Sequence, residues 1–120
     1  MSSGPTQKDT EIRAAIDELN EADENTRRAR EEVERWQREN PRPEQPQSVQ
    51  SMAEVEEFER RSEEWNKPYI ERRERLEQAQ VKLQAAQKKL QSLLPPHIGY
   101  EYKGRVYRLD GSTFRIDDVG

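Results

Sequence analysis

Hydrophobic positions recur with alternating spacings of three and four residues across residues 51–94. One position of this seam holds, in order, Val55, Ser62, Tyr69, Leu76, Leu83 and Leu90, and the other holds Phe58, Trp65, Arg72, Ala79, Ala86 and Leu93. A spacing sustained over this length is typical of a helix that packs along its length against another helix. Ser51 and Glu54 have the spacing of a capping box, and Pro95-Pro96 follow the last seam residue. The pattern therefore predicts a helix over residues 51–94.

A second seam with the same period lies upstream and predicts a helix over residues 9–39. Its members are Ile12, Ala15, Leu19, Ala22, Thr26, Ala29, Val33 and Trp36. Pro41 disfavours helical backbone in the residue before it, which ends this helix by Asn40. Residues 40–50 hold three prolines and no apolar period, as expected for a semi-rigid connector. Two long helices joined in this way predict an antiparallel two-helix coiled-coil hairpin over residues 9–94.

The charges of the two predicted helices favour an antiparallel pairing. Residues 9–24 carry seven acids and one base, whereas residues 67–94 carry three acids and seven bases. Opposite charges then meet along the hairpin, and they help to set its register. If the chain folds about the middle of the connector, paired positions sum to about 91. This register places Trp36 beside Val55, Ala29 beside Ser62 and Ala15 beside Leu76.

The expected register leaves the end of the second helix without a partner helix. Residue 9 would lie beside a position near residue 82, and the seam residues beyond it are Leu83, Ala86, Leu90 and Leu93. At 1.5 Å per residue this overhang spans roughly 18 Å. An apolar stripe of this length needs cover, either from the C-terminal segment folding back, from a second copy, or from a different protein.

Pro68 lies inside the predicted second helix. A proline there removes one hydrogen bond and crowds the carbonyl of Glu64, at a cost of about 3 kcal/mol. The helix is expected either to kink at Pro68 or to break and restart behind Asn66. Arg72, at a seam position one turn later, indicates loose packing.

Residues 97–120 change to a period of two and predict a three-stranded antiparallel β-meander. Lys103-Gly104 and Asp110-Gly111-Ser112 supply the turns, with a second strand over 105–109 and a third over 113–119. One face is expected to collect Tyr100, Tyr102, Tyr107, Leu109, Phe114 and Ile116. Such a small sheet cannot bury this face alone and needs a helix or another copy of itself.

Composition limits the fold and its surroundings. With 120 residues, 30% hydrophobic and 38% charged, the chain forms one shallow-cored domain at most. The scarcity of large aliphatic residues also raises disorder, but disorder does not predict a sustained heptad phase. Residues 1–8 are small and polar and are expected to be a disordered leader. The sequence has no cysteine, no run of the roughly 20 apolar residues that a membrane span needs, and no signal peptide, so we expect a cytoplasmic protein without membrane contact.

The sequence offers little catalytic or metal-binding chemistry. His97 is the only histidine, and no nucleophile or orienting carboxylate accompanies it in the sequence. Asp117 and Asp118 are adjacent strand residues that point to opposite faces, so they cannot chelate one ion together. No phosphate-binding loop, zinc spacing or nucleophile elbow is present. We therefore expect no enzyme, no cofactor and no metal site.

These observations favour a non-enzymatic coiled-coil interaction or assembly protein. The partner is expected to be a protein, first of all a second copy, bound through the end of the second helix and the meander. The residues expected to bind it are Leu83, Ala86, Leu90, Leu93, Tyr100, Tyr102, Tyr107, Leu109, Phe114 and Ile116. The alternative is a nucleic-acid-associated module that uses the basic half of the second helix and the aromatic and basic tail. The net charge of −4, and four acids against four bases in the tail, argue against it.

Overall fold

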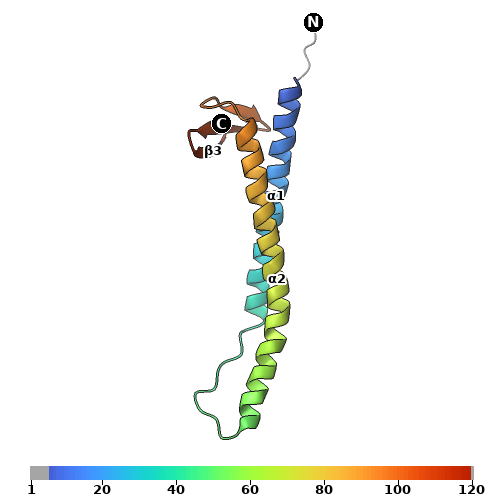
Figure 1. Ribbon diagram of the computed structural model, residues 1–120, viewed down its shortest axis with the longest axis vertical. Helices are drawn as coiled ribbons and strands as arrows, with labels where there is room; N and C mark the ends of the chain where they lie inside the picture. The colour runs from blue at the N-terminus through green and yellow to red at the C-terminus, as the bar shows by residue number, and fades with distance from the viewer. Residues whose placement is uncertain (1–5, 120) are drawn as a thin grey trace. The chain divides into compact units, whose positions relative to one another are not determined.

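The computed structural model describes residues 6–119 of the chain. Two helices, α1 (Gln7–Glu39) and α2 (Met52–Leu93), precede three strands, β1 (Tyr100–Tyr102), β2 (Arg105–Asp110) and β3 (Thr113–Asp118). The protein is an antiparallel two-helix hairpin followed by a three-stranded antiparallel meander, which confirms the predicted fold class (Figure 1). Of the predicted leader, residues 1–5 lie outside the described part of the chain, and Gln7 and Lys8 already belong to α1.

The chain forms two compact units, and each helix contributes a segment to both. Among the described residues, the first unit combines residues 6–23 with residues 81–119, and the second consists of residues 24–80. In each unit a segment of α1 lies beside a segment of α2 that runs in the opposite direction (Figure 1).

The core of the first unit joins both helices to the sheet. Its buried members are Ile12, Ala15, Ile16, Leu19, Ala86, Leu90, Leu94 and Tyr107. Ile16 lies outside the predicted seam yet is fully buried. A helix that contacts both a second helix and a sheet buries a wider apolar stripe than a coiled-coil seam does, and α1 does so here.

The sheet is a meander in which β2 lies between β1 and β3. Its register aligns Tyr100, Tyr107 and Ile116 across the three strands. Lys103 and Gly104 both have positive φ, 49° and 77°, as the first hairpin requires for a type I′ turn. At the second hairpin only Gly111, with φ of 60°, is left-handed, as in a type II′ turn.

A cluster of half-buried aromatic rings joins the two helices of the second unit near the connector. The ring of Trp65 lies 5.1 Å from that of Trp36 and stacks on Tyr69 at 4.8 Å, measured between centroids. The Trp65 indole N–H also donates to the carbonyl of Asn40 at 2.7 Å, which ties the start of the connector to α2. Further along this unit, Leu76 is buried.

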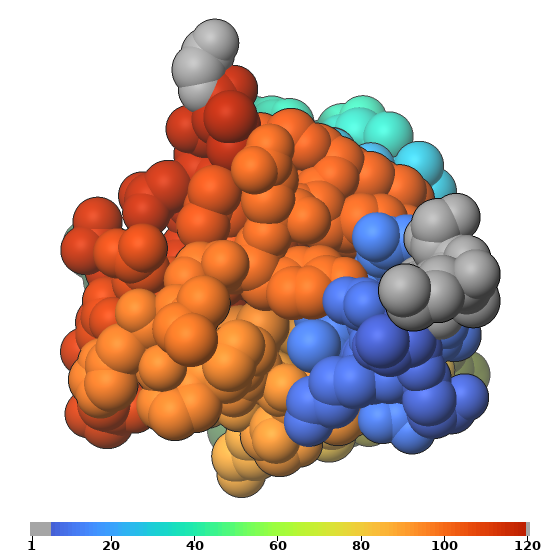
Figure 2. All heavy atoms as spheres, turned by 90° about the horizontal axis from the view of Figure 1, so that it is seen from above, coloured from blue at the N-terminus to red at the C-terminus, as the bar shows by residue number. Residues whose placement is uncertain are grey.

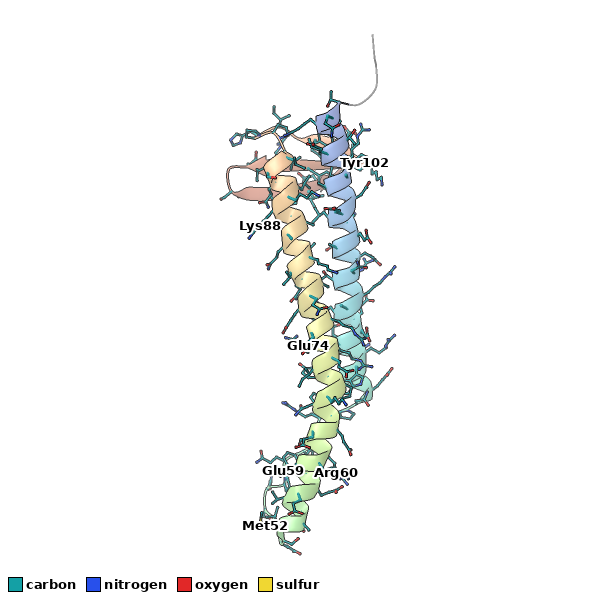
Figure 3. All side chains as sticks on the ribbon, turned by 45° about the vertical axis from the view of Figure 1, so that its right-hand side comes forward. Met52, Glu59, Arg60, Glu74, Lys88 and Tyr102 are labelled. Atoms are coloured by element: carbon teal, nitrogen blue, oxygen red, sulfur yellow. The ribbon has the colours of Figure 1, made fainter. Side chains whose placement is uncertain are left out.

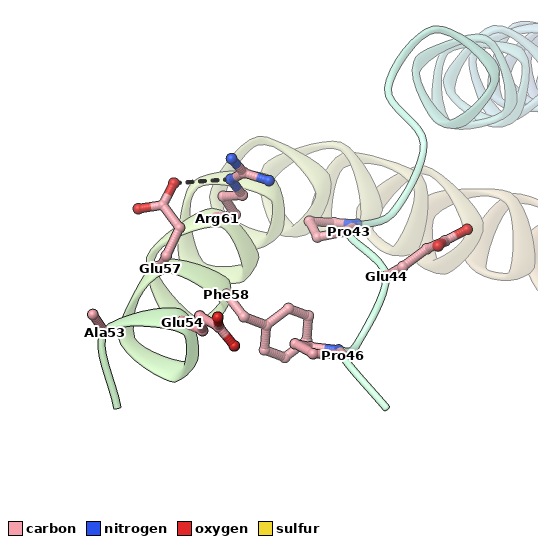
Figure 4. A pocket seen from close by; sticks show the side chains of 8 residues that line it. All are labelled: Pro43, Glu44, Pro46, Ala53, Glu54, Glu57, Phe58 and Arg61. Atoms are coloured by element: carbon pink, nitrogen blue, oxygen red, sulfur yellow. Dashed lines mark hydrogen bonds and ion pairs between the residues drawn. The ribbon is translucent and has the colours of Figure 1, made fainter. Parts of the chain in front are cut away.

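The predicted pairing register is wrong. Trp36 packs against Trp65 instead of Val55, and Glu32 forms an ion pair with Arg75 at 3.0 Å. The residue numbers of these pairs sum to values between 101 and 107, about two heptads above the prediction. The connector does not fold about its middle, because it runs along the first turns of α2 and Pro46 packs over Phe58 (Figure 4).

The predicted overhang at the end of α2 is therefore absent. In the observed register the N-terminal half of α1 lies beside the last turns of α2, and Glu18 forms an ion pair with Lys89 at 3.1 Å. Leu90 has no exposed surface and shares a cluster with Ile16 and Tyr107, so the meander does fold back onto the helices. The leucines at the end of α2 therefore have a partner helix in their own chain, so the predicted overhang no longer calls for a second chain to cover them.

Helix α2 continues through Pro68 without a break, so the alternative of a break and restart is wrong. Arg72 occupies the next seam position and makes two specific contacts there. Its guanidinium lies over the ring of Trp36 at 5.5 Å and donates to the carbonyl of Pro68 at 3.0 Å. Arg72 therefore makes a cation–π contact at this position, and the loose packing expected there stays a prediction.

The burial pattern of α2 leads to a first prediction. Leu76→Ala should lower the free energy of unfolding by about 2–4 kcal/mol, because it leaves a cavity in a closed seam. The matched control is Ile70→Ala, whose side chain is 51% exposed and should cost clearly less. Urea denaturation of both variants measures the difference, and equal losses would contradict the observed helix phase.

Candidate interaction site at the sheet

A polar stripe on α1 holds the first strand of the sheet. Asp9, Arg13 and Asp17 follow one another at intervals of four residues and so lie on one face of the helix. The Tyr100 hydroxyl donates to Asp9 Oδ1 at 3.0 Å, and the Tyr102 hydroxyl donates to Asp17 Oδ2 at 3.3 Å. Figure 3 shows Tyr102 beside the first turns of α1. These bonds fix β1, one edge of the sheet, against the helix.

Two further cations strengthen the same attachment. Lys103 forms an ion pair with Asp17 at 2.9 Å and lies 5.1 Å from the centre of the Tyr102 ring. The hydrogen bond from Lys103 to Asp17 raises the pKa of the lysine. Arg13 donates to the Tyr100 hydroxyl at 3.3 Å and lies over the Tyr102 ring. The heptad pattern does not predict this stripe, although its four-residue spacing is visible in the sequence.

The same stripe begins with a helix cap. The backbone N–H of Thr6 donates to Asp9 Oδ2 at 3.1 Å, and the Asp9 N–H donates back to the Thr6 hydroxyl at 3.1 Å. This reciprocal pair is a capping box, which explains why α1 starts two residues before the predicted position. Hydrogen bonds from the Thr6 backbone and hydroxyl, and then from the Tyr100 hydroxyl, lower the pKa of the Asp9 carboxyl.

The lowered pKa of Asp9 gives a pH prediction. The folded pKa lies below the unfolded one, so the carboxylate stabilises the fold at neutral pH and loses this effect as the pH falls through the folded pKa. Asp9→Asn should therefore lower the free energy of unfolding at pH 7, and the difference from the wild type should shrink below about pH 4. Urea titrations at several pH values measure it. Asp23→Asn removes one acid from an exposed site on α1 and is the control.

The two faces of the sheet have opposite characters. On the inner face Tyr107 is fully buried, whereas Ile116, its neighbour on β3, is 42% exposed at the rim. On the outer face the register sets Arg108 directly opposite Arg115. Two like charges at opposed positions destabilise a strand pair. Arg115 forms an ion pair with Asp117 at 3.5 Å.

The outer edge of β3 is open. In the strand order β1-β2-β3, β2 covers one edge of β3, and no described residue pairs with the other edge. Because a two-residue turn joins β2 to β3, Asp110 and Thr113 form the closing hydrogen-bonded pair, and alternate residues of β3 then bond to β2. The Val119 N–H donates to the Gly104 carbonyl at 2.9 Å, in agreement with this phase.

The backbone groups that point away from β2 therefore belong to Phe114, Ile116 and Asp118. Figure 2 shows the red residues of the C-terminal strand at the margin of this unit, on the side away from the blue residues of α1. An uncovered strand edge presents a row of free N–H and C=O groups, which is a template for another strand.

The structure brings all the residues expected to bind a partner into the first unit, but it leaves few of them open. Ala86, Leu90 and Tyr107 are buried. A second group is half-buried and packs against the core, namely Leu83, Leu93, Tyr100, Tyr102, Leu109 and Phe114. Ile116 alone in this set is exposed. Binding of a partner stays a prediction. Of the residues expected to bind it, the accessible ones lie on the β3 side of the sheet.

A hollow lies between the connector and the start of α2. Pro43, Pro46 and Phe58 form its apolar wall (Figure 4). Glu57 and Arg61 line the rim and pair with each other at 3.0 Å. The composition of residues 40–50 predicts a connector but not this hollow.

His97 has an acidic neighbour that the sequence did not reveal. Its Nδ1 lies 3.4 Å from Asp110 Oδ1, and its backbone N–H donates to the Leu109 carbonyl at 2.9 Å. The imidazole is largely exposed. Within residues 6–119, no group of three or more histidine, aspartate or glutamate side chains is arranged to hold a metal ion.

Comparisons with models of protein families, with curated proteins and with solved structures found no match to this chain. Across the described residues, neither helix is long and apolar enough to cross a membrane.

The buried hydroxyl of Tyr107 gives a further prediction. Its Oη is buried and has no hydrogen-bond partner among the described residues. Tyr107→Phe removes this unsatisfied group and keeps the shape of the ring, so the free energy of unfolding should stay the same or rise by about 1 kcal/mol. Tyr100→Phe, which removes a hydroxyl bonded to Asp9, should instead lower it. Urea denaturation of the two variants tests this contrast.

Proposed function

We propose that this protein is a non-enzymatic interaction or assembly module that binds a protein partner through its sheet. The helical hairpin acts as the scaffold, and no cofactor takes part. The cytoplasm remains the expected location from the sequence. The observation that carries the proposal is the uncovered edge of β3, a strand of six residues. Its neighbour β2 is paired on both edges, with β1 and with β3.

The two edges of the sheet differ in a way that supports this proposal. The Tyr100 and Tyr102 hydroxyls hold β1 on α1, so that edge belongs to the fold of the chain itself. Among the described residues none makes such an attachment at the edge of β3, and Ile116 adds exposed apolar surface beside it. Strand addition to such an edge gives affinity through main-chain hydrogen bonds and specificity through alternate side chains.

The nucleic-acid alternative has weaker support. It required free cations along the second half of α2 and in the tail. Arg75 pairs with Glu32, Lys89 pairs with Glu18, and Lys103 pairs with Asp17. Cations that already have carboxylate partners release fewer counterions from a phosphate backbone.

A photo-crosslinking experiment in cells that make the protein tests the proposal. A photoreactive residue replaces Asp118, whose side chain is 89% exposed at the open edge. The matched control replaces Val81, which is 66% exposed on α2. We expect a protein adduct from position 118 and none of the same mass from position 81.

A second variant links the adduct to the strand edge. Ile116→Pro removes an outward N–H without removing a bond to β2, so the sheet should persist while strand addition fails. The adduct from position 118 should then disappear. A nucleic-acid adduct, an adduct that survives Ile116→Pro, or no protein adduct at all would overturn the proposed function.

A further inference from the structure

We infer that the partner strand at this edge is β3 of a second copy, paired antiparallel about a two-fold axis at Ile116. The inference deepens the proposed function and depends on it. Two three-stranded sheets would then become one continuous sheet with β3 of each copy at its centre. The pattern of charges along β3 selects this occupant and this register.

The main-chain groups of β3 allow this pairing. In an antiparallel pair, facing residues have their side chains on the same face, so the residue numbers that face each other must have an even sum. With Ile116 on the axis, Ile116 faces Ile116 of the second copy, and Phe114 faces Asp118 of the second copy. These are the residues whose N–H and C=O groups point outward, so each facing pair exchanges two hydrogen bonds.

The outer face then becomes complementary in charge. Arg115 faces Asp117 of the second copy, and Asp117 faces Arg115 of the second copy. Both are non-hydrogen-bonded pairs, in which the side chains approach most closely. Within one chain Arg115 and Asp117 already lie 3.5 Å apart at comparable exposure, so the same groups need little rearrangement to pair across the axis.

The neighbouring registers are unfavourable. A shift that puts position 115 on the axis opposes two arginines, and a shift that puts position 117 on the axis opposes two aspartates. Like charges that are directly opposed destabilise a strand pair. Only the axis at Ile116 opposes unlike charges twice.

The same register relieves a defect inside each chain. Arg108 and Arg115 are opposed on the outer face of one sheet. An aspartate of the second copy on the other side of Arg115 would compensate this repulsion. On the inner face the 42% exposed Ile116 would gain its own counterpart as an apolar neighbour.

Single and paired charge reversals test the register. Arg115→Asp makes both outer positions acidic, and Asp117→Arg makes both basic, so each single variant should dimerise at least about tenfold more weakly than the wild type. The double variant Arg115→Asp with Asp117→Arg restores unlike pairs and should recover the wild-type affinity. An equimolar mixture of the two single variants should form a heterodimer. Sedimentation equilibrium of the full chain measures all four samples.

A cysteine substitution tests the axis directly, because the chain contains no cysteine. Ile116→Cys should form a disulfide between two copies under mild oxidation, since facing hydrogen-bonded residues have Cα atoms about 5.5 Å apart. Thr113→Cys is the control, because the same axis separates its two copies by six residue positions. Circular dichroism of each variant checks that the fold is kept.

Three results would overturn this inference. They are a wild-type chain that stays monomeric at high micromolar concentration, a dimer that is indifferent to both charge reversals, and a disulfide from Thr113→Cys in place of Ile116→Cys. A monomer that still gives an Ile116-dependent adduct with another protein at position 118 overturns only the second copy as occupant. A monomer that gives no protein adduct removes the proposed function as well.

Discussion

The burial of Tyr107 among α1 and α2 is the interaction on which the first unit depends. A three-stranded meander of this size has no core of its own, so its apolar face must be covered. The side chain of Tyr107 lies in one cluster with Ile16 and Leu90, and all three are fully buried. This docking also decides which edge of the sheet is used internally, because it brings β1 to the polar stripe of α1. The open edge at β3 is a consequence of how the sheet meets the helices.

The phase of the helices could be predicted from the sequence, but their register could not. Apolar residues at alternating spacings of three and four identify the buried stripe, and Leu76 and Leu90 are indeed buried. A shift of two heptads leaves every seam position on the seam, so the pattern permits several registers. The contacts that choose among them are specific, such as Trp36 on Trp65 and the Trp65 indole on Asn40. They depend on the path of the connector, which composition does not determine.

For the candidate site, the faces of the sheet could be predicted from the sequence, but the burial of each residue could not. Alternation in the tail predicted the meander and placed Tyr107 and Ile116 on one face, as the register confirms. Which of these residues is buried depends on where the helices lie under the sheet, and alternation carries no information about that. The hydrogen bonds of Tyr100 and Tyr102 join residues more than eighty positions apart. Only the folded chain shows that hydrogen bonds attach β1 to α1, whereas no strand within residues 6–119 pairs with the outer edge of β3.

The charges on β3 bear on whether its edge repels or accepts another strand. Natural proteins often place charged side chains on an edge strand to prevent unwanted pairing. Arg115 and Asp117 have this protective effect against a strand of arbitrary sequence, because a partner without the matching charges leaves both unpaired. Since they are opposite in sign and two positions apart, the same residues match when the strand meets itself about Ile116. In the proposed dimer, an edge of this kind would reject most strands and accept its own copy, which is how charge complementarity provides specificity more than affinity.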